Sequence, residues 1–105
     1  MSSFKDTSYF DIGTVDGNDI KVGSRVIGHV ANNQVTDAND QILGYVVGNT
    51  IVNLRDSVMA YFDDGEIYDG HHHIIGHYEG GDHTGAGGAA YMIFLTKKKV
   101  SKKAS

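Results

Sequence analysis

The chain contains no cysteine, no proline and no tryptophan among its 105 residues. Without cysteine it has no disulfide framework, no thiolate zinc site, no iron–sulfur ligation and no thiol nucleophile. No apolar run approaches the roughly 18–20 residues that a membrane-spanning helix needs. Residues 1–11 lack a basic segment followed by an apolar one, so they do not resemble a secretory signal peptide. These absences predict a small cytoplasmic domain without covalent or thiolate cross-links.

Basic residues are scarce over most of the chain. Residues 1–96 carry 13 acidic and four basic side chains, a net charge of −9, whereas residues 97–105 carry five lysines and no acid. This composition predicts a disordered, Lys-rich tail over residues 96–105. A solvated end is the simplest interpretation of the segment Lys97–Lys103. Contact with nucleic acid or an anionic membrane surface is the alternative, although the acidic body would repel nucleic acid.

Glycine is abundant, with 14 residues, and its placement reveals a repeat. A dipeptide of an apolar residue and a small one recurs at intervals of 15, 16, 16 and 16 residues. Its copies are Ile12-Gly13, Ile27-Gly28, Leu43-Gly44, Met59-Ala60 and Ile75-Gly76. Two further apolar columns, which start at Val15 and Ile20, keep the same register. The regularity predicts a repeat domain over 12–95, preceded over 1–11 by a lead-in or an extra strand.

Each repeat is predicted to be a β-hairpin. Between the two inner apolar columns lie pairs of residues that tolerate positive φ: Gly17-Asn18, Asn32-Asn33, Gly48-Asn49, Asp64-Gly65 and Gly80-Gly81. Two-residue turns of type I′ or II′ require such residues. A two-residue turn fixes the register, so Val15 is expected to face Ile20, with equivalent pairs in the other repeats.

Glycine within a strand needs a structural cause, and the pattern indicates one. Close backbone approach where the repeats converge would exclude side chains larger than that of Ala60. After the last repeat, residues 85–88 are predicted to be a flexible connector. They lead into the apolar run 89–95, whose length favours a final buried strand over a short helix.

The repeat unit resembles a known family. Its order is apolar-Gly-aromatic-apolar, a turn, an apolar strand and an Asp-rich turn, as in the bacterial four-fold beta flower proteins. Choline-binding and WG-type hairpin arrays usually carry the tryptophan that this chain lacks. The resemblance covers residues 12 to about 84 and, in character, the basic tail. It implies four hairpins around a pseudo-four-fold axis. Together with the repeat and the run 89–95, the expected fold is all-β, with four to five 16-residue hairpins around that axis and a C-terminal apolar strand. The resemblance implies no particular activity.

The position after each apolar–Gly pair supplies the candidate ligand-binding residues. Four repeats have His29, Tyr45, Tyr61 and His77 there. Around a pseudo-four-fold axis these side chains would form a ring that stacks on a small molecule or carbohydrate and orients it. The alternative is that they form the half-exposed second face of each hairpin and pair with residues of the neighbouring strand.

Five of the six histidines fall within residues 71–83. His71 and His73 would point the same way in an extended segment, which makes them the candidate ligands for Zn²⁺, Ni²⁺ or Cu²⁺. A solvated turn between repeats is the alternative, and metal binding there would be adventitious. Residues 37–40 resemble the start of a calcium loop but lack its Gly and Glu continuation, so we expect an Asx turn. We expect no physiological cofactor.

The sequence contains no recognisable catalytic arrangement. No serine lies in a G-x-S-x-G elbow, and turn chemistry accounts for Asp37 and Asp69 better than an acid–base pair does. We therefore expect a non-catalytic structural or protein-interaction module. A small-molecule or carbohydrate-binding module is the alternative. Apolar residues on both faces of each hairpin predict a homo-oligomer or another protein partner, unless the run 89–95 covers one face.

Overall fold

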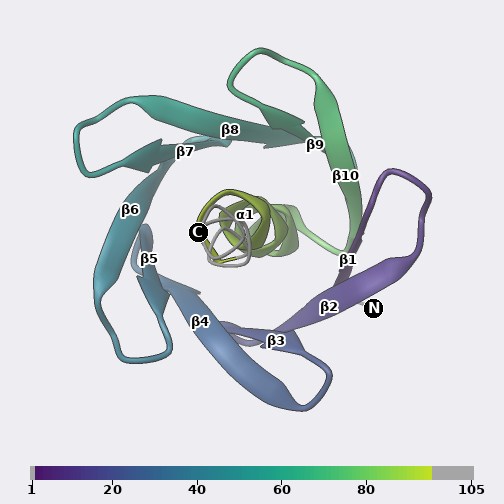
Figure 1. The fold of residues 1–105 in the computed structure, drawn as a ribbon, viewed down its shortest axis with the longest axis horizontal. Coiled ribbons are helices and arrows are strands. Elements are labelled where there is room, and N and C mark those ends of the chain that lie inside the picture. Colours follow the sequence, from purple (N-terminus) through teal and green to yellow (C-terminus); the bar gives the residue numbers. More distant parts are fainter. Residues whose placement is uncertain (1, 96–105) are drawn as a thin grey trace, which may run out of the picture.

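The computed structural model describes residues 2–95, in which ten strands form a closed antiparallel barrel around a central helix (Figure 1). The strands are β1 (Ser3–Lys5), β2 (Asp11–Asp16), β3 (Asp19–Val22), β4 (Arg25–Ala31), β5 (Gln34–Asp37), β6 (Ile42–Val47), β7 (Thr50–Asn53), β8 (Val58–Asp63), β9 (Glu66–Asp69) and β10 (Ile74–Glu79). Each strand pairs with its neighbours along the chain, and β1 pairs with β10 to close the barrel. The expected all-β repeat of hairpins around an axis is confirmed.

Five petals, not four, surround the axis. Each petal is a pair of strands, β1–β2, β3–β4, β5–β6, β7–β8 or β9–β10, whose connecting loop extends outward (Figure 1). Four two-residue turns link successive petals. The first and last petals have no such turn between them and are joined by strand pairing alone, as where Ser3 pairs with Glu79. The pseudo-four-fold axis expected from the sequence is therefore wrong. The fifth petal is completed by β1, which lies within residues 1–11, expected to be a lead-in or an extra strand.

The first four predicted turns are confirmed. Asp16 pairs with Asp19 and Ala31 pairs with Gln34, which leaves two residues in each turn. Asn32 and Asn33 have φ of 54° and 63°, as a type I′ turn requires. The fifth prediction, a turn at Gly80-Gly81, is wrong: β10 ends just before these residues, and they lead into a helix.

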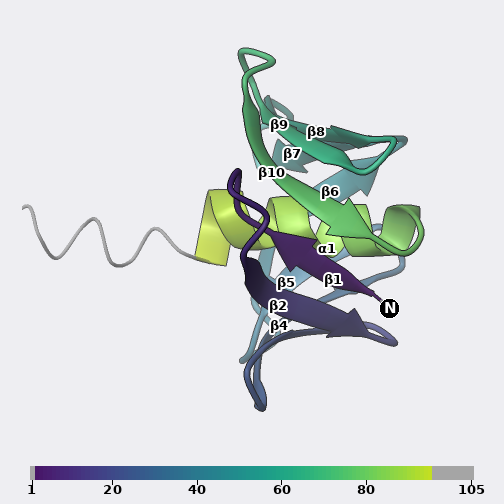
Figure 2. The same ribbon diagram turned by 90° about the vertical axis from the view of Figure 1, so that its right-hand side faces the viewer.

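The segment that follows β10 forms helices along the axis of the barrel (Figures 1 and 2). The α-helix α1 spans Asp82–Ala90, and the π-helix η1 continues it over Tyr91–Leu95. The predicted connector over 85–88 and the predicted C-terminal strand over 89–95 are therefore both wrong. Every barrel strand is already paired on both sides, so no edge is left for another strand. A segment buried on the axis must satisfy its own backbone hydrogen bonds, and a helix does so.

Residue sizes on the wall and on the axis are complementary. Near the start of α1 the wall is bulky and the helix is thin: a Cβ on Gly85 would lie 2.7 Å from Tyr78 Cζ. Near the end the sizes are reversed, since a Cβ on Gly28 would lie 3.1 Å from Leu95 Cδ1 and 2.7 Å from the Thr36 carbonyl oxygen. The predicted close approach at the strand glycines is confirmed. The neighbouring strand and the central helices both impose it.

A β-bulge at the apolar residue before each small residue explains the second apolar column. Ile20 pairs with Gly28 but Lys21 pairs with Val26, so Ile27 is the extra residue of its strand. The other four petals shift register at the equivalent place. Bulges re-aim side chains, and Ile12, Ile27, Leu43 and Ile75 all pack against the core cluster, as do residues 91–95. The run 89–95 thus covers this column, which was one of the two expected solutions.

The predicted Lys-rich tail, 96–105, lies outside the described residues. Within residues 2–95, neither helix is long and apolar enough to cross a membrane.

Candidate functional site

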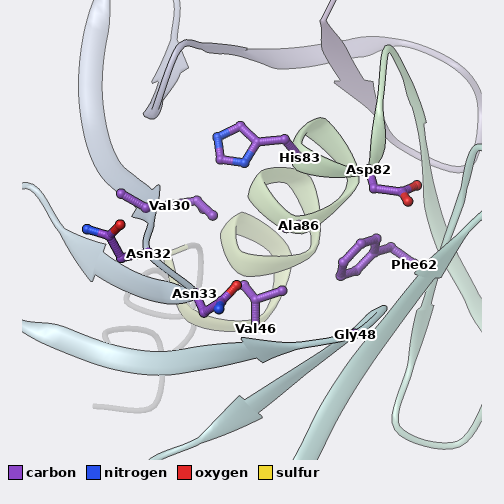
Figure 3. A pocket seen from close by; sticks show the side chains of 10 residues that line it. Val30, Asn32, Asn33, Val46, Gly48, Phe62, Asp82, His83 and Ala86 are labelled. Carbon is purple, nitrogen blue, oxygen red and sulfur yellow. The ribbon is translucent and has the colours of Figure 1, made fainter.

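One end of the axis carries the two-residue turns and the first turn of α1, and we call it the mouth (Figure 2). A cavity of about 270 Å³ opens there, between α1 and the turns of β4–β5 and β6–β7 (Figure 3). Its floor is apolar and consists of Val30, Val46, Phe62 and Ala86. Its rim is polar and includes Asn32, Asn33, Asp82 and His83. An apolar floor with a few polar groups at the edge is typical of a site for a small ligand or a single side chain.

The cavity exists because side-chain size varies around the barrel. One inner-facing position holds Val15, Val30, Val46, Phe62 and Tyr78 in the successive repeats. Where this position is aromatic, the ring reaches α1 and contacts it at Gly85. Where it is valine on β4 and β6, the shorter side chains face Ala86 and leave space. This position is apolar in every repeat, but its side-chain volume varies. The cavity lies where the side chains are small.

Negative charge is concentrated at the mouth. Seven of the 13 acidic residues flank the turns or lie in one, end β10 or begin α1: Asp16, Asp19, Asp63, Asp64, Glu66, Glu79 and Asp82. Against them Lys21 pairs with Asp16, with its Nζ 3.1 Å from Oδ2. His83 contacts a backbone carbonyl group and not a carboxylate: its Nε2 lies 3.0 Å from the Gly17 carbonyl oxygen. The mouth therefore attracts cations and repels anions.

The phenol of Tyr78 is buried at the same end. Its side chain is 6 % exposed, and its hydroxyl has no hydrogen-bond partner. Burial raises the pKa of Tyr78, and the negative charges of Asp82 and Asp63 add to the effect. The hydroxyl is enclosed and does not line the cavity, so it is not itself open to a group that enters the mouth.

The predicted ring residues His29, Tyr45, Tyr61 and His77 lie on the outer surface of the barrel. Their strand positions alternate with those of the inward-facing glycines and core residues. His29 pairs with Thr36, Tyr45 with Val52 and Tyr61 with Tyr68, as the alternative interpretation expected. Since α1 and η1 occupy the axis, the structure does not bring the four together around an axial cavity. A ligand-binding role for each of them stays a prediction.

Three of these residues contact the loop of the next petal around the barrel, and His29 also contacts Asp19 on the neighbouring strand β3. His29 Nδ1 lies 2.9 Å from Asp19 Oδ1, and its Nε2 lies 3.8 Å from Asp40 Oδ1. Tyr61 stacks on His72 with the ring centroids 4.4 Å apart. His77 stacks on Tyr9 at 4.0 Å and is 9 % exposed. The loop residues Tyr9, Asp40 and His72, all at positive φ, thus cover the outer position that the sequence singled out.

Four of the five petal loops share one hydrogen-bond pattern. Asp37 Oδ1 accepts from the backbone N–H of Asn39 at 2.8 Å and of Gln41 at 3.0 Å, which confirms the expected Asx turn. The equivalent acceptors in the other three loops are Asp6, Asn53 and Asp69. The fifth loop, between β3 and β4, is shorter and turns at Gly23, which has φ of 65°.

The candidate metal ligands His71 and His73 lie in the loop between β9 and β10. Their ring centroids are 6.3 Å apart, and His73 Nδ1 lies 3.6 Å from Asp69 Oδ2. Both backbone N–H groups bond to Asp69, and together with the histidine charges they lower the pKa of that carboxyl. Within residues 2–95 no group of three His, Cys, Asp or Glu side chains is placed to hold a metal ion. Metal binding by the two histidines stays a prediction.

Of the seven large apolar side chains that are exposed among the described residues, four lie on β6, on β8 or in the loop between β7 and β8. We call the surface made by Ile42, Tyr45, Val47, Leu54 and Val58 the apolar face. Val47 and Leu54 are each 59 % exposed, and Ile42 and Val58 about 40 %. Residues 41–62 contain one base and one acid, so this face is neutral on a strongly acidic body.

A family model for five-fold beta-flower proteins matches residues 1–104. The chain belongs to this family. Neither a curated protein nor a solved structure is significantly similar to it. The five-fold beta flower is a close relative of the four-fold family that the repeat resembles, and its name agrees with the five petals of the structure.

The sequence interpretation left residues 1–11 of this five-fold beta flower open between a lead-in and an extra strand, although a signal for the strand exists. Phe4 precedes Ile20 by 16 positions and is fully buried in the same inner column. Asp6 holds its loop as Asp37 does. The cavity at the mouth had no such signal, because it depends on the central helix.

Proposed function

We propose that this five-fold beta flower is a non-catalytic interaction module that pairs with a second copy of itself through the apolar face. The observation that carries the proposal is the coincidence of exposed apolar surface with local neutrality. Val52, 7 % exposed, lies between Tyr45 on β6 and Val58 on β8 and makes the centre of the face apolar as well. Contiguous apolar patches on a small domain mark interaction sites.

Charge favours a second copy as the occupant of this face. Two bodies with the same strong negative charge repel each other within about a Debye length, roughly 10 Å at 0.1 M salt. The apolar face is where this repulsion is smallest, since Arg55 and Asp56 offset each other. Pairing there would bury what remains exposed of Val47, Leu54 and Val58, which are 59 %, 59 % and 41 % exposed, so each would contribute about 1 kcal/mol.

The chemistry of the mouth cavity supports a role without catalysis. No serine, threonine, lysine or tyrosine side chain lines it, and the groups in its lining that could act as nucleophile, acid or base are Asp82 and His83. The histidine at its rim, His83, is engaged with a backbone carbonyl.

The test compares Val58→Lys with Phe10→Lys, which adds the same charge at a site 71 % exposed outside the apolar face. Light scattering coupled to size exclusion, at 20–200 µM protein in roughly 0.3 M salt, should give a dimer mass for the unaltered chain. Phe10→Lys should keep that mass, and Val58→Lys should weaken dimerisation at least tenfold, with unchanged circular dichroism. A monomer throughout this range, or equal behaviour of the two variants, would refute the proposal.

A further inference from the structure

We infer that the mouth cavity binds a lysine of the segment 97–103 from another copy, so that molecules also join head to tail. This inference does not depend on the apolar face. It concerns a separate surface, at the opposite end of the axis from Leu95. Salt should weaken this contact between opposite charges, whereas it should favour pairing of two acidic bodies through the apolar face.

The cavity suits the two parts of a lysine side chain. A lysine buries its four-carbon stem along apolar surface and keeps its ammonium group among polar partners. Val30, Val46 and Phe62 offer the apolar surface, and Asp82 at the rim offers a carboxylate. The side-chain oxygens of Asn32 and Asn33 add acceptors for an ammonium group, which has three donors and no acceptor.

The charges of the mouth and of the segment are complementary. The mouth carries seven carboxylates, and the segment carries five lysines and no acid. Such complementarity speeds encounter and strengthens binding at low salt.

Covalent geometry assigns the segment to another copy. The 14 residues from Asp82 to Leu95 carry the chain along the axis to the end opposite the mouth (Figure 2), over about 20 Å. A return path must leave the axis, pass outside a body that measures 35 and 29 Å across the axis, and come back to the axis, which is roughly 50 Å of chain. The eight residues 96–103 span at most about 28 Å when fully extended. They cannot reach their own mouth.

The test uses the full chain with the five lysines replaced (Lys97→Gln, Lys98→Gln, Lys99→Gln, Lys102→Gln and Lys103→Gln), which leaves the mouth empty of its own ligand. A synthetic peptide of residues 96–105 is titrated into this variant by calorimetry, at about 20 mM and about 300 mM salt. Binding is expected at low salt and should weaken at least tenfold at high salt. Amide shifts should centre on Asn32, Val46 and Ala86.

Matched variants locate the contact. In the same background, Asp82→Asn should weaken peptide binding at least fivefold, and Val46→Phe, which fills the cavity, should do the same. Asp56→Asn, which removes a charge from a petal loop, should leave it unchanged. Equal weakening by Asp82→Asn and Asp56→Asn would show attraction to net charge alone and overturn the inference. So would absence of binding at low salt, or a peptide that binds duplex DNA but not the mouth.

The two self-associations are separable. At low salt the unaltered chain should show masses above a dimer, whereas the five-glutamine variant should not. Val58→Lys should leave the low-salt head-to-tail contact intact. Loss of one contact with retention of the other tells which proposal has failed.

Discussion

The hydroxyl of Tyr78 is, within the described part of the chain, the buried side-chain polar atom that lacks a hydrogen-bond partner. Its ring packs at the start of α1, against the glycine that makes room for it. The desolvated hydroxyl costs stability, because water would have bonded to it in the unfolded chain. Since Asp82 and Asp63 are close to it, this destabilising hydroxyl lies at the mouth end of the barrel.

Tyr78→Phe should therefore stabilise the folded chain. The change removes the unpartnered hydroxyl and keeps the ring, so the free energy of unfolding should rise by about 1 kcal/mol. Thermal unfolding followed by circular dichroism should show a midpoint about 4–8 °C higher. The control is Tyr68→Phe, which deletes a hydroxyl that donates to Glu66 Oε1 at 2.6 Å and should give no gain. A lower midpoint for Tyr78→Phe would mean that the hydroxyl has a partner in solution.

Glycine has a different meaning at each place in this chain. In the turns it supplies positive φ, as at Gly17 and Gly48. In α1 glycine leaves room for bulky side chains of the barrel wall to pack against the helix backbone. Each glycine nevertheless costs a helix about 1 kcal/mol in propensity. The segment 85–88 therefore looks like a linker by composition. Only the bulk of Phe62 and Tyr78 on the wall shows why it is a helix.

At the scale of elements, the petal loops are held by one repeated acceptor. Asp69 accepts from two backbone N–H groups of its loop, and these bonds lower its pKa. A carboxyl with a lowered folded-state pKa stabilises the fold at pH values above its unfolded pKa, about 3.9. That contribution is lost as pH falls through the lower folded-state value.

Asp69→Asn should flatten the loss of stability in acid. The amide oxygen keeps both hydrogen bonds, as Asn53 does in the preceding loop, but it does not titrate. Melting temperatures measured from pH 6 down to about pH 3 should fall less steeply for Asp69→Asn than for the unaltered chain. Asp69→Ala should melt lower at every pH, since it loses both bonds. Parallel curves for the unaltered chain and Asp69→Asn would show that ionisation of Asp69 does not matter.

The elements that the sequence predicted correctly are those whose cause is local. Turn pairs such as Asn32-Asn33 fix a hairpin by their own backbone preferences. The Asp37 turn is likewise determined within five residues. The run 89–95 was predicted wrongly because its apolar character fits a buried strand or a buried helix equally well. The decision between them depends on barrel closure, which no window of sequence contains.

At the scale of the whole molecule, closure rests on β1, a strand of three residues. Phe4 on β1 is fully buried and packs at the axis, where Gly88 leaves space for it. The same strand pairs with both β2 and β10. The count of petals depends on this strand as well, since β1 and β2 together make the fifth petal.

Phe4→Ala should lower the free energy of unfolding by about 3–5 kcal/mol, as deletion of a buried aromatic ring usually does. Chemical denaturation in urea gives this value directly. Phe10→Ala is the matched control, since that ring is 71 % exposed and its loss should cost less than about 0.5 kcal/mol. Similar losses for the two variants would contradict the role of β1 in closing the barrel.

The seam between β1 and β10 also has a consequence for synthesis. The two strands are separated by some 70 residues, so the earliest strand to leave the ribosome waits for one of the last. At about 5–20 residues per second, this delay lasts several seconds. During it the nascent sheet has two unpaired edges and an unfilled centre, since α1 is made later still. The unpaired sheet edges of a growing chain are thus most prone to pair with those of neighbouring chains on a polysome just before β10 and α1 are added.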